Sequence, residues 1–216
     1  MLSIFFFSTP FVLHVLVHAV AGLGFDRLAG LSILQGINAY SSELCSGVCI
    51  GANGDYVMEF ENQSSEDVIL VLWGPEGSWV NAKTPLVTYE LSVGSAINIS
   101  LVDSTSGGWS AVYSDTILVN GQISNTWGEF TYDGHYSTFD VSRLPNMTGH
   151  GLSIQSTLCT ADMQTCVFVC TSDDSCQYDY ELLNCKGVGA SAGSNNDAPS
   201  GGCSVGPSNY VKAVLL

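Results

Sequence analysis

Two carboxylates flank a strong signal for a tight β-hairpin turn. Glu129 and Asp140 lie on either side of Asp133-Gly134, a dipeptide favoured in two-residue turns because both turn residues accept positive φ. Such a turn pairs Tyr132 with His135, so alternate residues of the two strands share a face. One predicted face carries Phe130, Tyr132, Phe139 and Val141. The other carries the two acids as diagonal neighbours, together with Trp127, Thr131, Tyr136 and Thr138.

The acidic face has the groups needed to bind or to cleave a sugar. Carboxylates accept hydrogen bonds from vicinal hydroxyls, and aromatic rings such as Trp127 and Tyr136 can stack on a pyranose. The same acids could be the proton donor (Glu129) and the nucleophile or base (Asp140) of a glycoside hydrolase. Solvated carboxylates are equally typical of the outer face of any half-exposed antiparallel sheet. A three-residue turn would place the acids on opposite faces and remove the site.

The hairpin belongs to a succession of short runs rich in strand-forming residues. Gly, Ser, Asn and Asp separate these runs, and this pattern predicts an all-β antiparallel sandwich. We assign its core to residues 56–158 and expect residues 22–55 to form a poorly ordered start followed by a cysteine-tied turn. The other predicted strands are 56–61, 67–73, 86–91, 96–102, 109–113, 116–119, 152–157 and 210–216.

The eight cysteines predict four disulfides. An even number of cysteines in an exported chain indicates bridges, whose connectivity the spacing leaves open except that Cys45 and Cys49 are expected to pair locally. Residues 159–216 form a predicted disulfide-rich region, with a flexible loop at 187–202, where Gly, Ala, Ser and Asn bury little apolar surface. No C-x-x-C repeat occurs, so we expect neither a metal nor a cofactor. The cysteines are Cys45, Cys49, Cys159, Cys166, Cys170, Cys176, Cys185 and Cys203.

The beginning of the chain has the character of a secretory signal. No residue before Asp26 is charged, and Ala19-Val20-Ala21 offers a peptidase cleavage site, which predicts a signal peptide at residues 1–21. An uncleaved anchor is the alternative, because the segment approaches the roughly 20 residues of a membrane span. We expect a secreted, extracellular protein with no stable membrane association after cleavage. Three glycosylation sequons agree with export and begin at Asn62, Asn98 and Asn146.

The charge of the chain excludes one class of partner. Twenty acidic residues against five Lys and Arg give a net charge of −15. No basic patch can outweigh this field near phosphates, so nucleic acid is not a partner. The acidity suits a soluble protein in acidic surroundings, where partial protonation reduces repulsion. We expect a monomer.

Four short motifs, taken in order, resemble the thaumatin-like protein family. The resemblance covers roughly residues 56–155 and implies a thaumatin-like antiparallel β-sandwich. In that family the Glu of Glu-Phe-Thr and the Asp before Val-Ser line an acidic cleft that faces carbohydrate, which carries over to Glu129 and Asp140. The motifs here are Phe60-Glu61-Asn62, Ser106-Gly107-Gly108-Trp109, Glu129-Phe130-Thr131 and Phe139-Asp140-Val141-Ser142.

The chain also departs from the family pattern. Pro145 stands where the family usually carries another acidic residue of the cleft, and no cysteine lies between Cys49 and Cys159. The likeness is therefore greatest to reduced, secreted microbial members, including fungal ones considered effectors. The missing acid argues for holding a sugar chain and against cutting it.

Three functions follow as hypotheses. The first is a non-enzymatic protein that binds extracellular cell-wall polysaccharide of the β-1,3-glucan type through Glu129, Asp140, Trp127, Tyr136 and Thr138. The second is a weak endo-β-1,3-glucanase that uses the same two acids. The third is a secreted effector acting on a host surface protein, for example through the loop from Trp73 to Trp79, whose tryptophans could equally cap the core.

Two further groupings are more typical of solvated surface than of a site. His150, Ser153 and Asp162 could form a nucleophilic triad on paper, but no Gly-x-Ser-x-Gly elbow surrounds any serine. Asp173-Asp174 lacks the spaced oxygen ligands of a calcium loop.

Overall fold

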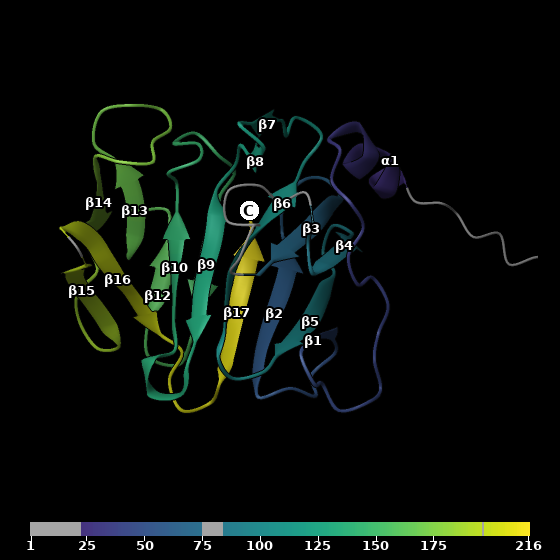
Figure 1. The fold of residues 1–216 in the computed structure, drawn as a ribbon, viewed down its shortest axis with the longest axis horizontal. Coiled ribbons are helices and arrows are strands. Elements are labelled where there is room, and N and C mark those ends of the chain that lie inside the picture. The colour runs from purple at the N-terminus through teal and green to yellow at the C-terminus, as the bar shows by residue number, and fades with distance from the viewer. Residues whose placement is uncertain (1–22, 75–83, 196) are drawn as a thin grey trace, which may run out of the picture.

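The chain folds as an all-β sandwich of two sheets that are largely antiparallel (Figure 1). The computed structural model describes residues 23–74, 84–195 and 197–216, so the predicted signal peptide and Trp79 lie outside the described residues. Within these ranges, no helix has the length and apolar character needed to cross a membrane. The sandwich predicted from the strand pattern is confirmed.

The larger sheet carries the predicted acidic hairpin. Its strands run in the order β14 (Tyr180–Leu183), β13 (Val167–Cys170), β10 (Thr138–Ser142), β9 (Trp127–Tyr132), β6 (Thr105–Val112), β3 (Val68–Trp73) and β4 (Val87–Leu91). A hairpin of β15 (Ala190–Asn195) and β16 (Ala198–Ser204) joins this sheet because β16 pairs with β10.

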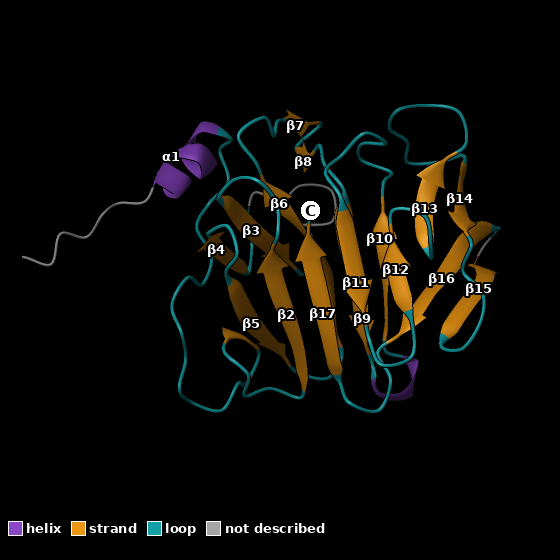
Figure 2. Cartoon of the chain, turned by 180° about the vertical axis from the view of Figure 1, so that it is seen from behind, coloured by secondary structure: helices purple, strands orange, loops and turns teal. Residues whose placement is uncertain are grey.

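The smaller sheet closes the other side of the core, as the view from behind shows (Figure 2). Its order is β1 (Val48–Ile50), β5 (Ala96–Leu101), β2 (Tyr56–Asn62), β17 (Tyr210–Leu215), β11 (Leu152–Gln155) and β12 (Thr160–Asp162). A separate short hairpin consists of β7 (Leu118–Val119) and β8 (Gln122–Ile123).

Strand alternation fills the space between the sheets. Along β2, Met58 and Phe60 are fully buried whereas Glu59 and Glu61 face outward. From the larger sheet, Trp109 meets Phe60 edge to face, with ring centroids 4.8 Å apart. Burial of these large apolar side chains is the main stabilising contribution to the sandwich.

The larger sheet has a second apolar cluster on its outer face. The helix α1 (Leu23–Gly30) lies there and buries Leu28 in the same cluster as Val71, Trp73 and Trp127. Because α1 covers the outside of β3, all six residues of that strand are buried. The predicted poorly ordered start is therefore wrong for residues 23–30. The short apolar face of α1 is sufficient to order this segment because it packs on a hydrophobic strand.

Four disulfides tie the described chain. Cys45 pairs with Cys49 as predicted, and the other three bridges all lie in the C-terminal region, which confirms its disulfide-rich character. These are Cys159–Cys203, Cys166–Cys185 and Cys170–Cys176. Such bridges are typical of proteins that fold in an oxidising compartment.

The predicted loop at 187–202 is a strand hairpin for most of its length. Composition suggested a loop because little apolar surface is available there, but β15 and β16 are held by backbone pairing instead. Because Gly202 has no side chain, β16 can lie close to β10. A Cβ at this position, where φ is +149°, would lie 2.7 Å from the Phe139 carbonyl oxygen. The bridge at Cys203 then fixes the end of β16 to the rest of the fold.

Candidate functional site

The turn between β9 and β10 is longer than predicted and brings the two acids closer together. A 3-10 turn at Gly134–Tyr136 connects the strands, and Asp140 pairs directly with Glu129. The predicted two-residue turn is wrong because Asp133 has φ −145°, not the positive φ that this turn requires. Gly134 N instead donates to Asp103 Oδ1 at 2.8 Å.

The change of register leaves the predicted faces intact. The ladder is displaced by two residues, which is one full side-chain repeat, so every residue keeps its side of the sheet. Phe130 and Phe139 point into the sandwich core, as predicted. Glu129 and Asp140 share the outer face as direct cross-strand neighbours, not as diagonal ones.

The two acids line a pocket of about 250 Å³ on the outer face of the larger sheet, named here the acidic pocket. Asp140 is only 8% exposed and Glu129 is half-buried. Phe168 and Tyr180 stand edge to face on β13 and β14, with centroids 5.9 Å apart, and form an aromatic wall. The remaining lining consists of Ser142, Leu144 and the β16 segment Pro199, Ser200 and Gly201.

Burial shifts both acids toward the protonated form. Desolvation raises the pKa of Glu129 to about 7, against the opposing effect of the Ser142 hydroxyl. Desolvation also raises the pKa of Asp140 well above its usual value, and the Glu129 carboxylate raises it further. Two adjacent carboxylates in a desolvated site avoid being ionised together, so we expect the pair to retain a proton near neutral pH.

Two polar atoms near the pair are buried without a hydrogen-bond partner. They are Asp140 Oδ1, in the lining of the acidic pocket, and the indole Nε1 of Trp73. Buried polar atoms are nearly always paired in folded proteins. The pocket therefore has hydrogen-bonding capacity that the protein's own groups leave unused.

Trp73 stands in one cross-strand row with the acids. Trp73 pairs with Gly108, Gly108 with Glu129, and Glu129 with Asp140. The indole fills the space over Gly108, where a Cβ would lie 3.0 Å from its Nε1. Glycine at this position thus allows a large ring to pack beside the acid pair.

The structure assembles only part of the predicted binding face. Trp127 is 5% exposed, donates from Nε1 to the Ile123 carbonyl at 2.8 Å, and packs against Trp73. Its predicted role in sugar stacking is wrong because the cluster beneath α1 encloses the ring. Tyr136 is 80% exposed in the turn, and neither it nor Thr138 lines the acidic pocket.

The missed residues lie on strands that are distant in sequence. Phe168 belongs to the apolar run Val167–Cys170, whose length is sufficient to suggest a buried strand. Tyr180 and the residues of β16 carry no comparable signal. Tyr180 lies in a short run, and β16 consists largely of small residues. Only the pairing of β13 and β16 with β10 brings them to the acids.

The structure also locates the other candidate surfaces. Trp73 is fully buried, so it caps an apolar cluster and cannot form part of an exposed surface for a host protein. His150 Nε2 lies 3.0 Å from Asp115 Oδ1, whereas Ser153 and Asp162 pair across β11 and β12. The hypothetical triad is therefore not assembled.

The sequons differ in accessibility. Asn62 is fully buried, and its Nδ2 donates to the carbonyls of Glu66 at 2.9 Å and Leu91 at 2.8 Å. The Asn62 amide is thus not an accessible glycosylation acceptor in the folded chain. Asn98 and Asn146 are partly exposed, and their glycosylation remains a prediction.

Comparison with known proteins assigns the family. The family model of the Allergen Asp f 4-like domain matches residues 51–207, which include the acid pair, the aromatic wall and β16. No curated protein matches the chain. The similarity to thaumatin-like proteins stays a hypothesis about distant relationship. The chain belongs to the family of the Allergen Asp f 4-like domain.

Proposed function

We propose that this chain is a secreted, non-enzymatic protein that binds cell-wall polysaccharide of the β-1,3-glucan type in the acidic pocket. The observation that carries the proposal is the buried, unpartnered Asp140 Oδ1 beside the aromatic wall of Phe168 and Tyr180. A sugar hydroxyl would supply the missing donor, and an apolar sugar face would lie against a ring.

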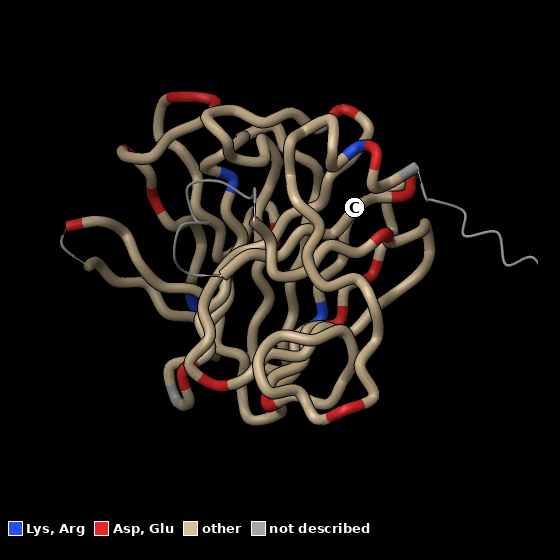
Figure 3. Tube along the Cα trace, turned by 45° about the vertical axis from the view of Figure 1, so that its right-hand side comes forward, with Lys and Arg blue, Asp and Glu red and all other residues tan. Residues whose placement is uncertain are grey.

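The charge distribution supports a neutral ligand. Figure 3 shows acidic residues on many sides of the molecule and few basic ones, in keeping with the net charge of −15. Such a field repels anions. A pair of acids that retains one proton can both donate and accept hydrogen bonds, which matches the hydroxyl groups of an uncharged sugar.

Removal of both acids is expected to weaken polysaccharide binding at least tenfold, because two hydrogen-bonding groups are lost from a desolvated site. The test measures depletion of the Glu129→Ala, Asp140→Ala double variant from solution by insoluble glucan, chitin and mannan. Glu43→Ala, which removes an exposed acid outside the pocket, is the matched control. Unchanged binding of the double variant to every polysaccharide would disprove the assignment of this pocket.

A second candidate function, weak endo-glucanase activity, is favoured by the direct pairing of Glu129 with Asp140. Cross-strand neighbours have Cβ atoms roughly 5 Å apart, which is compatible with the short carboxylate separation of retaining glycosidases. An acid with a pKa of about 7 could also act as a proton donor near neutral pH. Release of reducing ends from a β-1,3-glucan, abolished by Glu129→Gln, would establish cleavage in place of simple binding.

A further inference from the structure

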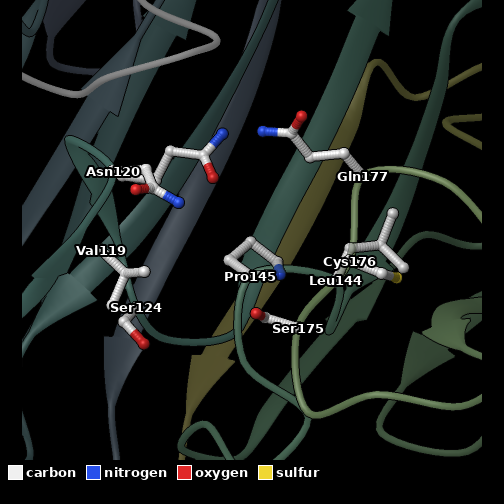
Figure 4. Close-up of a pocket in the computed structure, with 9 residues that line it drawn as sticks. Val119, Asn120, Ser124, Leu144, Pro145, Ser175, Cys176 and Gln177 are labelled. Carbon is white, nitrogen blue, oxygen red and sulfur yellow. The ribbon is translucent and has the colours of Figure 1, made fainter.

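A second pocket adjoins the acidic pocket. It has a volume of about 330 Å³ and is named here the amide pocket, because Asn120, Gln122 and Gln177 line it. Figure 4 shows Asn120 and Gln177 on opposite sides, with Pro145 between them. Its lining contains no Asp, Glu, Lys or Arg, although the chain as a whole is strongly acidic.

Two short, constrained segments form the walls of the amide pocket. Asn120 and Gly121 have φ of +53° and +81° and make the tight turn of the β7–β8 hairpin. The opposite wall belongs to the loop closed by the Cys170–Cys176 disulfide. Cys176 N donates to the Leu144 carbonyl at 2.9 Å and fixes this loop to the turn that follows β10. The amide groups are thus presented from constrained backbone.

The amide side chains are free to bind a ligand. Asn120, Gln122 and Gln177 form no side-chain hydrogen bond with any residue that the structure describes. Each amide offers both a donor and an acceptor, and each is uncharged. This is the chemistry that recognises neutral, hydroxyl-rich ligands, and Pro145 adds an apolar surface between the walls.

The two pockets follow one another along the same stretch of chain. Ser142 lines the acidic pocket, Leu144 lines both pockets, and Pro145 lines the amide pocket. The chain passes from one pocket to the other through a turn at residues 143–146, which is closed by a hydrogen bond from Asn146 N to the Arg143 carbonyl at 3.1 Å. The two linings share Leu144 and otherwise differ, so a ligand that occupies both pockets must reach past Leu144, as a chain of linked sugar units does.

We propose that the acidic and amide pockets are consecutive subsites for one neutral oligosaccharide. This inference rests on the proposed function, because the acidic pocket provides the first subsite. The acid pair binds one sugar unit, and the amide pocket binds a further unit of the same chain. Pro145, which occupies the place of an acid in thaumatin-like proteins, then contributes to a subsite that suits uncharged sugars.

The test is calorimetric titration of the full mature chain with β-1,3-linked glucose oligomers from the mono- to the hexasaccharide. Affinity is expected to rise with length until both pockets are filled. The Gln122→Ala, Gln177→Ala double variant should lose about tenfold in affinity for the long oligomers, from the loss of two hydrogen-bonding groups. Its affinity for the shortest oligomer that binds should be unchanged. Asn120 is left intact because its positive φ disfavours alanine.

The control and the two kinds of failure are distinct. Gln164→Ala removes an exposed amide that lines neither pocket and should bind like the parent chain. If affinity is independent of length, or if the double amide variant binds long oligomers normally, the second subsite is disproved while sugar binding stands. If Glu129→Ala with Asp140→Ala leaves binding unchanged, the proposed function of the acidic pocket fails, and the two-subsite proposal fails with it.

Discussion

Replacing Cys159 and Cys203 together by alanine is expected to lower the free energy of unfolding by about 4 kcal/mol, the largest loss among the disulfides of the C-terminal region. This bridge joins residues separated by 44 positions, whereas 19 and 6 separate the other two pairs of that region. A longer closed loop restricts the unfolded chain more strongly. Cys203 also lies in β16, beside its last residue Ser204, so we expect the change to loosen one wall of the acidic pocket.

Equilibrium urea denaturation with the other three bridges intact measures this loss. The matched control is Cys170→Ala with Cys176→Ala, whose short loop predicts a loss of about 2 kcal/mol. Equal losses in the two variants, or a reversed order, would contradict the argument from loop length. A separate binding measurement on the folded Cys159→Ala, Cys203→Ala protein would show how far ligand binding depends on the bridge that holds β16 against the acidic pocket.

The acid pair is expected to make the protein less stable as the pH rises from about 4.5 to about 7. In the unfolded chain Glu129 releases its proton near 4.5, whereas in the folded chain its pKa is about 7. Between these values the folded state binds a proton that the unfolded state has lost, so raising the pH favours unfolding. The stabilisation is complete below about 4.5, and about 3 kcal/mol is lost by the end of the window. Asp140 acts in the same direction.

Glu129→Gln should reduce this pH dependence, because the amide resembles the protonated acid and does not titrate, whereas burial still raises the pKa of Asp140 in the variant. The variant should equal the parent chain in stability near pH 4.5 and exceed it near pH 8, as measured by urea denaturation at both values. Glu181→Gln, which changes an exposed acid on β14, should keep the parental dependence. A parent chain whose stability does not fall across this window would refute the assignment of a raised pKa to Glu129.

Other carboxylates act in a separate pH range. Tyr210 and then Lys212 lower the pKa of Glu59, and Lys212 lowers that of Glu61. Their contributions are present above the ordinary carboxylate pKa and disappear as the pH falls below it. The change of stability between about pH 4.5 and pH 7 is therefore attributed to the buried pair, Glu129 and Asp140.

The sequence predicted the sandwich and the shared face of Glu129 and Asp140 because both depend on a local repeat of two residues. It did not predict the turn, since the carboxylate of Asp103, distant in sequence, supports the longer connection at Gly134. It also did not predict the burial of Trp127. That burial depends on α1, which contributes Leu28 to the same cluster from about one hundred residues away in sequence.

The aromatic wall and β16 were beyond the reach of local patterns for a related reason. Small residues and a single tyrosine do not indicate a site on their own, and backbone pairing with β10 gives them their position. The eight cysteines predicted four bridges, but only the folded chain shows that Cys159 joins Cys203. Local repeats thus identified the acids, and long-range pairing built the pocket around them.

The register of the β9–β10 hairpin limits how this loop can vary among homologues. A slip of one residue between β9 and β10 would turn one of the two acids toward the sandwich core and an apolar side chain toward solvent. A slip of two residues restores the alternation. Homologues that keep the acid pair should therefore absorb a single-residue change of length between Tyr132 and Thr138, outside the ladder, or carry a compensating bulge in β9 or β10.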